Sequence, residues 1–255
     1  MRSNPDFPSR RLARSGLALL VIFWCSFRTR AQEASVKGKV EVTSPVATKQ
    51  FSAASRALPA ADAVVWLSPL DADSAAPSPG SSAGKLQLIQ RNKSFDPHML
   101  VVRVGSVVQF PNKDPFFHNV FSLFDGKRFD LGLYEAGSSN SVRFDRPGIS
   151  YLFCNIHPEM SAVVIAVPTP YFAITDVSGQ WTIPNVPDGR YRLYLWYERS
   201  SPEDLEKLQR EIVISETSRS LETVRVVGSA ASNSAHKNKY GKDYVPPSNP
   251  AYSNP

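Results

Sequence analysis

Short apolar stretches bounded by turn residues recur along most of the chain, and this pattern constrains the fold more than any other sequence feature. Residues 36–42 alternate between small apolar and charged residues, as a half-buried strand does, and residues 63–67 form a more continuous apolar run. Further candidate strands cover residues 85–90, 99–104, 106–110, 141–144, 149–154, 162–167, 172–175, 180–183, 190–197, 211–214 and 223–227. Many short strands with regular turns are typical of β-sandwiches. The sequence therefore predicts an all-β protein, with one short helix that Ser201 would cap.

The first 31 residues have the features of a secretory signal peptide. A basic stretch precedes an apolar run from Gly16 to Phe27, and small residues follow at plausible cleavage positions. As a helix this run would span about 18 Å, which is too short for a hydrocarbon layer of about 30 Å. We therefore expect export to the periplasm or the extracellular space, with no membrane span after cleavage. A retained anchor is the alternative, because Arg28 and Arg30 follow the run directly.

Most of the positive charge lies in this N-terminal segment. The formal net charge is +6, but residues 1–31 hold six arginines and one aspartate, which leaves 23 basic and 22 acidic residues in the remainder. A nearly neutral body lacks the basic surface that binding to phosphate backbones requires. Nucleic acid is therefore excluded as an expected partner.

Two segments are poor in residues that a core can bury. Residues 71–85 consist largely of Ser, Ala, Pro and Gly, which predicts a linker. Residues 229–255 contain Ser, Asn, Lys, Pro and Tyr with almost no aliphatic side chains, which predicts a disordered tail.

One loop concentrates metal-binding side chains. Cys154, His157 and Met160 place a thiol, an imidazole and a thioether within seven residues, between two expected strands. Because Cys25 lies in the signal segment, the mature chain would keep Cys154 alone and could not form an internal disulfide. Cys154 is then a buried thiol, an intermolecular disulfide partner or a metal ligand. Sulfur and nitrogen ligands together suit copper, whereas methionine is a poor zinc ligand. A trigonal site with two imidazoles needs one more histidine, and His118 is the candidate.

At this point the sequence resembles the cupredoxins, the blue copper electron carriers. The resemblance covers residues 86–167, and its first half is carried by Phe95-Asp96-Pro97, Gly105, Val107-Val108-Gln109-Phe110, Asn112, Asp114 and His118-Asn119-Val120. The loop from Cys154 to Met160, with a proline directly after its histidine, is similar to the short ligand loop of plastocyanin- and amicyanin-like members. A charged residue, Glu159, stands where members of the family are often apolar.

This resemblance implies a Greek-key β-sandwich that binds one type 1 copper. His118 and His157 would be the equatorial nitrogen ligands, Cys154 the thiolate and Met160 the weak axial ligand. Asn119 would hydrogen-bond near the thiolate loop and hold the two ligand loops together. The alternative for His118, which is flanked by phenylalanines, is a hydrogen-bonded core histidine without a metal.

A second resemblance covers residues 35–70 and 168–228. The segments Thr175-Asp176, Trp181-Thr182-Ile183 and Asn185 to Tyr191 are similar to the transthyretin-like domain of carboxypeptidase regulatory regions. The two strands with which that module begins match Gly38-Lys39-Val40 and residues 63–67, before the copper domain. We therefore expect a smaller transthyretin-like sandwich into which the copper domain is inserted, because a lone hairpin is marginal in water. Two consecutive domains with an extra hairpin are the alternative. Some methylamine-utilisation proteins show a similar pairing.

These features predict an exported type 1 copper protein that carries one electron at a time and docks transiently with redox partner proteins. His157, on a loop expected at the surface, would be the point of electron exchange. No open coordination position and no nucleophile–base arrangement is visible in the sequence, so no enzyme is expected. The alternative function is an envelope binding or structural protein, or one for copper storage or delivery, without electron transfer.

Overall fold

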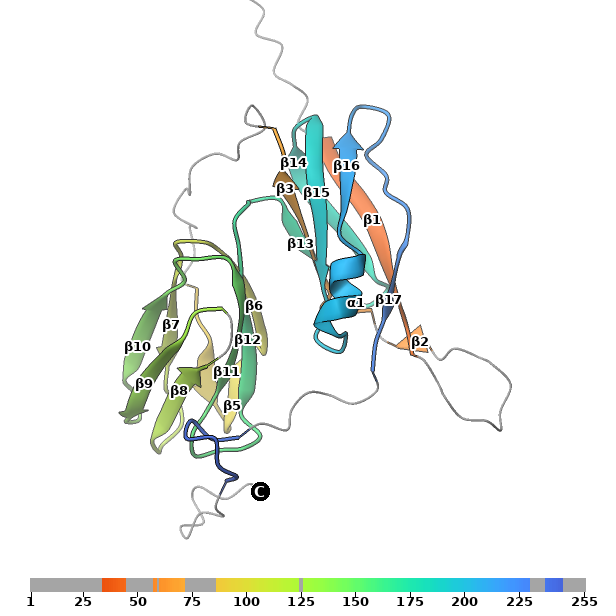
Figure 1. Cartoon of the computed structure of the whole chain (residues 1–255). Helices are drawn as coiled ribbons and strands as arrows, with labels where there is room; N and C mark the ends of the chain where they lie inside the picture. The colour runs from red at the N-terminus through yellow and green to blue at the C-terminus, as the bar shows by residue number, and fades with distance from the viewer. Residues whose placement is uncertain are drawn as a thin grey trace, which may run out of the picture. The chain divides into compact units, whose positions relative to one another are not determined.

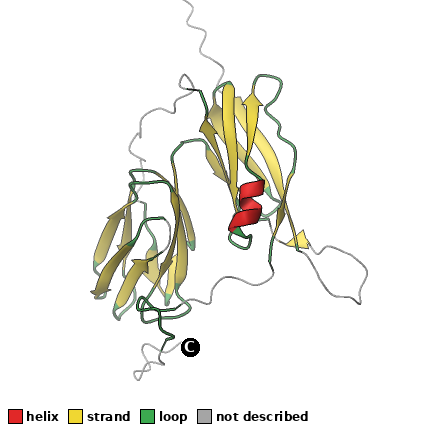
Figure 2. Cartoon of the chain, in the orientation of Figure 1, coloured by secondary structure: helices red, strands yellow, loops and turns green. Residues whose placement is uncertain are grey.

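The computed structural model describes residues 34–44, 57–58, 60–71, 86–123, 126–229 and 237–244. Within these ranges the chain consists almost entirely of strands and their connecting loops (Figure 2), so the predicted all-β class is confirmed. The expected signal segment and nearly all of the expected linker lie outside the described residues.

Residues 86–167 form a unit of nine strands that we call the central sandwich (Figure 1). Its five-stranded sheet has the order β6-β12-β11-β8-β9, and β10 pairs with β7 while β4 pairs with β5. The strands are β4 (Ile89–Arg91), β5 (Ser94–Asp96), β6 (Met99–Arg103), β7 (Val107–Pro111), β8 (His118–Ser122), β9 (Phe129–Tyr134), β10 (Ser139–Arg143), β11 (Gly148–Phe153) and β12 (Ser161–Val167). Isolated bridges join Gln87 to Gln109 and Gln90 to Asn112.

The strands that precede residue 71 pair with strands that follow residue 168, and we call this unit the flanking sandwich. One sheet has the order β14-β1-β17, with β2 beside β1, and the other has the order β13-β3-β15-β16. The strands are β1 (Ala34–Thr43), β2 (Ala57–Leu58), β3 (Val64–Pro69), β13 (Phe172–Ile174), β14 (Gln180–Val186), β15 (Gly189–Trp196), β16 (Arg210–Ile214) and β17 (Val224–Val227). Its kinship to transthyretin-like modules, and the domain boundaries given above, stay predictions.

Strand β12 explains why part of the sequence lacks alternation. Ala162 to Val167 is a continuous apolar run, and each of these side chains is buried. Ala162, Val164 and Ala166 belong to the buried apolar cluster of the central sandwich. Val163, Ile165 and Val167 belong to the other buried cluster, which also contains the core of the flanking sandwich. A strand whose two faces are both covered needs apolar residues at every position.

Local sequence signals set the turns and the single helix among the described residues. Helix α1 (Pro202–Lys207) begins as expected at Ser201, whose hydroxyl accepts a hydrogen bond from the backbone N–H of Asp204 at 3.1 Å. In the β13–β14 turn the Asp176 carboxylate accepts backbone hydrogen bonds from Ser178 and Gln180. No helix in the described part of the chain has the length and apolar character that crossing a bilayer requires.

Candidate metal centre

Three nitrogen and sulfur donors meet inside the central sandwich. His118 is the first residue of β8, Cys154 directly follows β11, and His157 lies in the loop that leads to β12. The ligand atoms of these three side chains lie within 4.8 Å of one another. The Cys154 sulfur is 3.8 Å from Nδ1 of His118 and 3.5 Å from Nδ1 of His157. All three residues have no solvent-exposed surface.

These distances fit a single bound ion. Nitrogen and sulfur bond a first-row metal such as zinc at about 2.0–2.3 Å, so two donors about 120° apart are separated by about 3.5–3.8 Å. Both imidazoles turn the same nitrogen, Nδ1, towards the sulfur. The separations of the Cys154 sulfur from the two imidazole nitrogens therefore match those of donors that share one metal ion.

Asp114 fixes the orientation of His118. The Nε2–H of His118 donates to the Asp114 carboxylate at 2.7 Å, which leaves the lone pair on Nδ1 pointing at the centre. A carboxylate that holds the far nitrogen of a metal-binding histidine is a recurrent feature of protein metal sites. Asp114 is among the residues that carry the family resemblance, but its role in holding His118 was not predicted; its position four residues before His118 was the available signal.

The Asp114 carboxylate is itself held by the backbone. Its two oxygens accept the N–H groups of Asn92 at 2.7 Å and Lys93 at 3.0 Å, and its own N–H donates to Asn112 Oδ1. Asn92 and Lys93 have left-handed backbone conformations, with φ of 53° each, which turn both N–H groups towards Asp114. Burial opposes ionisation of this carboxyl, but the N–H donors and His118 outweigh it and hold its pKa below the usual value.

Burial sets the protonation of the three donors. It raises the pKa of the Cys154 thiol, against the opposing hydrogen bonds from the backbone N–H groups of Asn119, Ile156 and His157. Burial also lowers the pKa of His118, and together with repulsion from His118 it lowers the pKa of His157 to about 4. Neutral imidazoles are ready to coordinate at neutral pH, whereas the thiolate needs the compensating charge of a cation.

The ligand loop is closed by its own backbone. The N–H of Cys154 donates to the carbonyl of Met160 at 3.1 Å, and the N–H of Met160 donates to the carbonyl of His157 at 3.2 Å. Met160 is fully buried and belongs to the same apolar cluster as Cys154. The four side chains expected to bind copper thus occupy one buried end of the central sandwich, with the three nitrogen and sulfur donors in direct proximity.

Asn119 contacts the thiolate loop through its backbone N–H, which bonds Cys154. Its side-chain N–H₂ donates to Asp130 at 2.7 Å and to the carbonyl of Gly132 at 2.9 Å, so the side chain ties β8 to β9. One expectation about this region differs from the structure: His157 is fully buried instead of lying at the surface. Its ring packs 5.7 Å from that of Phe116, a neighbour that sequence spacing does not reveal.

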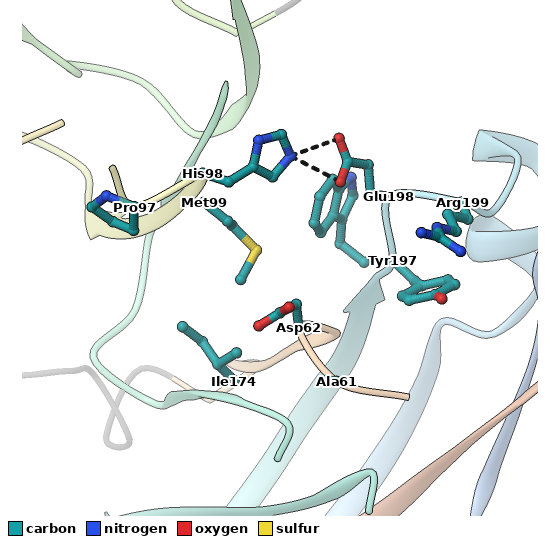
Figure 3. A pocket seen from close by; sticks show the side chains of 10 residues that line it. Ala61, Asp62, Pro97, His98, Met99, Ile174, Tyr197, Glu198 and Arg199 are labelled. Carbon is teal, nitrogen blue, oxygen red and sulfur yellow. Dashed lines mark hydrogen bonds and ion pairs between the residues drawn. The ribbon is translucent and has the colours of Figure 1, made fainter. Parts of the chain in front are cut away.

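A pocket elsewhere shares no residue with the metal centre (Figure 3). His98, Met99, Trp196 and Glu198 are among the residues that line it. Nε2 of His98 lies 3.1 Å from both carboxylate oxygens of Glu198, and about half of the His98 side chain is exposed. The described side chains of this pocket bring no third metal-binding group to that pair.

Comparisons with known proteins give structural similarities only. No family model and no curated protein matches the sequence. A purple cupredoxin from Nitrosopumilus maritimus matches at 24% identity and a TM-score of 0.31, over 32% of this chain and 100% of its own. A copper-containing nitrite reductase from Thermus scotoductus SA-01 matches at 24% identity and a TM-score of 0.32, over 39% of this chain and 27% of its own. A reduced amicyanin mutant matches at 20% identity and a TM-score of 0.31, over 36% of this chain and 97% of its own. With TM-scores this low, the functional proposal rests on the donor atoms themselves.

Proposed function

We propose that the central sandwich binds one copper ion through Cys154, His118 and His157, with Met160 as a weak fourth ligand, and that the protein carries one electron at a time. The observation that carries this proposal is the convergence of one thiol and two Nδ1 atoms, 3.5 and 3.8 Å from the sulfur, without solvent exposure. Bound copper would supply the reversible change between Cu(II) and Cu(I).

The chemistry of the donors favours copper over zinc. Structural zinc sites use four cysteine or histidine ligands, and catalytic zinc sites keep an open position for water. The described residues bring three such donors together, and the remaining sulfur of the loop is the buried thioether of Met160. A thioether is a ligand for copper and is rare on zinc.

The surrounding residues suit electron transfer because they restrict movement of the ligands. Asp114 holds His118 from behind, and the two backbone hydrogen bonds of the loop hold His157 and Met160. Burial keeps water away from the donors. A site whose ligands cannot rearrange freely loses little energy to reorganisation when its charge changes by one.

We propose that redox partner proteins approach over the exposed apolar side chains next to the centre. Phe117, which precedes His118, is 47% exposed, and Leu133, which pairs with Asn119 across β8 and β9, is 59% exposed. An electron donor and an electron acceptor would use this surface in turn, through interfaces below about 1,200 Å² as is usual for transient redox contacts. Both histidines are buried, and the electron would pass by way of His118 because Phe117, its neighbour in the chain, reaches solvent.

The remaining parts of the chain fit an exported protein. We propose that residues 1–31 direct export and that the flanking sandwich positions the central sandwich as a structural or binding module. Secretion of the mature chain, with its N-terminus near residue 32, is checked by mass spectrometry of fractionated cells. Recovery of the intact chain from the cytoplasm would contradict the proposed export.

The test of the copper proposal is titration of the purified metal-free protein with Cu(II). We expect one equivalent to produce an intense visible thiolate-to-copper absorption, which ascorbate removes and ferricyanide restores. An equimolar zinc competitor should not prevent the band. Tight binding of Cu(I) without such a band would contradict the proposed electron-carrier function and favour storage or delivery of copper. Full burial of the site also agrees with storage or delivery.

A further inference from the structure

A short segment near the C-terminus contacts the backbone of the metal-ligand loop. Residues 237–244, which we call the C-terminal strap, lie inside the stretch that composition predicts to be disordered (Figure 1, dark blue). The hydroxyl of Tyr244 donates to the carbonyl oxygen of Cys154 at 2.8 Å. This bond joins the strap to the residue that carries the only sulfur among the three clustered donors.

Lys239 adds two further contacts beside the centre. Its backbone N–H donates to Oδ1 of Asn155 at 3.1 Å, on the residue that follows Cys154. Its Nζ donates to Oδ2 of Asp130 at 2.7 Å, while Oδ1 of Asp130 accepts the side-chain N–H₂ of Asn119 at 2.7 Å. Lys239 is therefore linked to both sides of the centre, to the ligand loop directly and to β8 through Asp130.

The strap has a fixed shape of its own. Oδ1 of Asn238 accepts the backbone N–H groups of Tyr240 at 3.0 Å and Lys242 at 3.1 Å, and the N–H of Asn238 donates to the carbonyl of Lys242 at 2.9 Å. Gly241 closes this turn with a φ of 72°, a conformation in which glycine is favoured. A closed turn lowers the entropy cost of presenting Lys239 to the ligand loop.

From these contacts we propose that the C-terminal strap locks the ligand loop over the metal centre, with Tyr244 and Lys239 as positioning residues that slow metal uptake and loss. The inference rests on the proposed metal binding at Cys154 and His157. To release an ion, the loop must move His157 away from Cys154, and the strap holds the two residues, 154 and 155, about which that movement would begin. Tyr244 bonds the carbonyl of Cys154 and Lys239 bonds the side chain of Asn155, so both residues act on the loop that carries the donors.

The experiment compares full-length copper-loaded variants in an excess of chelator. The rate of copper release is measured from the decay of the thiolate-to-copper absorption. Tyr244→Phe removes one hydroxyl, and Lys239→Met removes the ion pair with Asp130. Because a hydrogen bond contributes about one order of magnitude or less to an equilibrium, we expect release to become about 5-fold faster in each variant and about 20-fold faster in both together. A chain that ends at Ser229 should release copper at least as fast as the double variant.

The controls are the unmodified protein and Lys242→Met, which removes an equal charge from an exposed position of the same turn. Lys242→Met should release copper at the rate of the unmodified protein. Equal release rates for Tyr244→Phe, Lys239→Met and these controls would overturn the strap.

A second measurement does not depend on copper. Hydrogen exchange of the Cys154 and Met160 amides in the metal-free protein reports opening of the ligand loop. We expect faster exchange in Tyr244→Phe and Lys239→Met than in the controls, with unchanged exchange in β14 and β15. Unchanged exchange at the loop would overturn the proposed role of the strap even if copper binds. Absence of a thiolate-to-copper band in the unmodified protein would overturn the proposed function, and the exchange result would then decide on the strap by itself.

Discussion

The central and flanking sandwiches differ most in what they bury. Among the described residues eleven polar side chains are buried, and eight of them lie in the central sandwich: Gln90, Asn112, Asp114, His118, Asn119, Ser122, Ser150 and His157. In the flanking sandwich, Thr175 is a buried polar residue whose hydrogen bonds are satisfied by the backbone. Its hydroxyl donates to the carbonyl of Ala60 and accepts the N–H of Ala63. Its largest fully buried side chains are apolar or tyrosine.

This difference separates stability from function. Burial of a polar group costs free energy unless a partner satisfies it, so a fold that needed only stability would not gather so many. In the central sandwich several of these groups converge on Cys154 or support residues that do. We therefore expect changes in the central sandwich to alter metal binding at modest cost in stability, and core changes in the flanking sandwich to do the reverse.

The largest effect is expected from Cys154→Ser. This variant keeps the size of the side chain but removes the thiolate, so the visible absorption should disappear and copper affinity should fall by at least about 100-fold. Absorption spectroscopy during copper titration measures both, and circular dichroism checks that the fold is retained. A variant that kept the coloured band would show that the sulfur of Cys154 is not a ligand.

Leu193→Ala sharpens the comparison from the other side. Leu193 on β15 is fully buried in the flanking core, so its truncation should lower the free energy of unfolding by about 2–5 kcal/mol. The position and intensity of the thiolate-to-copper band should not change, because the residue belongs to the cluster that lacks the donors. Denaturant unfolding and the copper spectrum give the two readings. A shifted band would mean that the flanking core reaches the metal centre.

Asp114→Asn should weaken the centre less than loss of a ligand. The asparagine fills the same space but cannot offer two acceptor oxygens to His118 and to the N–H groups of Asn92 and Lys93. Loss of such a supporting group usually reduces metal affinity about 10–100-fold. Competition with a chelator measures the affinity, and Asp145→Asn, at an exposed position, is the matched control. Equal affinities for the two variants would show that Asp114 does not support His118.

How far the sequence predicts this molecule depends on whether a residue serves the core or the site. Apolar periodicity located β12 and β15 to within about two residues, because their side chains are selected for burial. Apolar periodicity did not predict strand β8, although all five of its residues are buried. It begins with two polar residues, His118 and Asn119, which contribute to the candidate metal centre and do not follow the apolar pattern that is typical of strands.

The site itself was predictable in its donors and not in their supports. Cys154, His157 and His118 follow from ligand chemistry and chain order, but the bond between Asp114 and His118 depends on a loop conformation set by Asn92 and Lys93. Composition also hides the C-terminal strap, because its contacts come from one tyrosine and one lysine in an otherwise polar segment. A small number of specific hydrogen bonds can thus order a segment that has almost no aliphatic side chains to bury.

The smallest expected effect concerns the pair formed by His98 and Glu198, which lines the pocket that shares no residue with the metal centre. The hydrogen bond that the His98 Nε2–H donates to the Glu198 carboxylate raises the pKa of His98 above its ordinary value of 6.5. The charged pair therefore stabilises the fold most fully below pH 6.5, and the contribution disappears as the pH rises through the raised pKa. Because both side chains are partly exposed, at 49% and 36%, the gain should stay below about 1 kcal/mol. The difference in unfolding free energy between the unmodified protein and His98→Gln, measured from pH 5.5 to 8.5, should therefore shrink with increasing pH, and Glu198→Gln should remove this trend. A difference that grew with pH would mean that burial, which lowers the pKa of His98, outweighs the carboxylate.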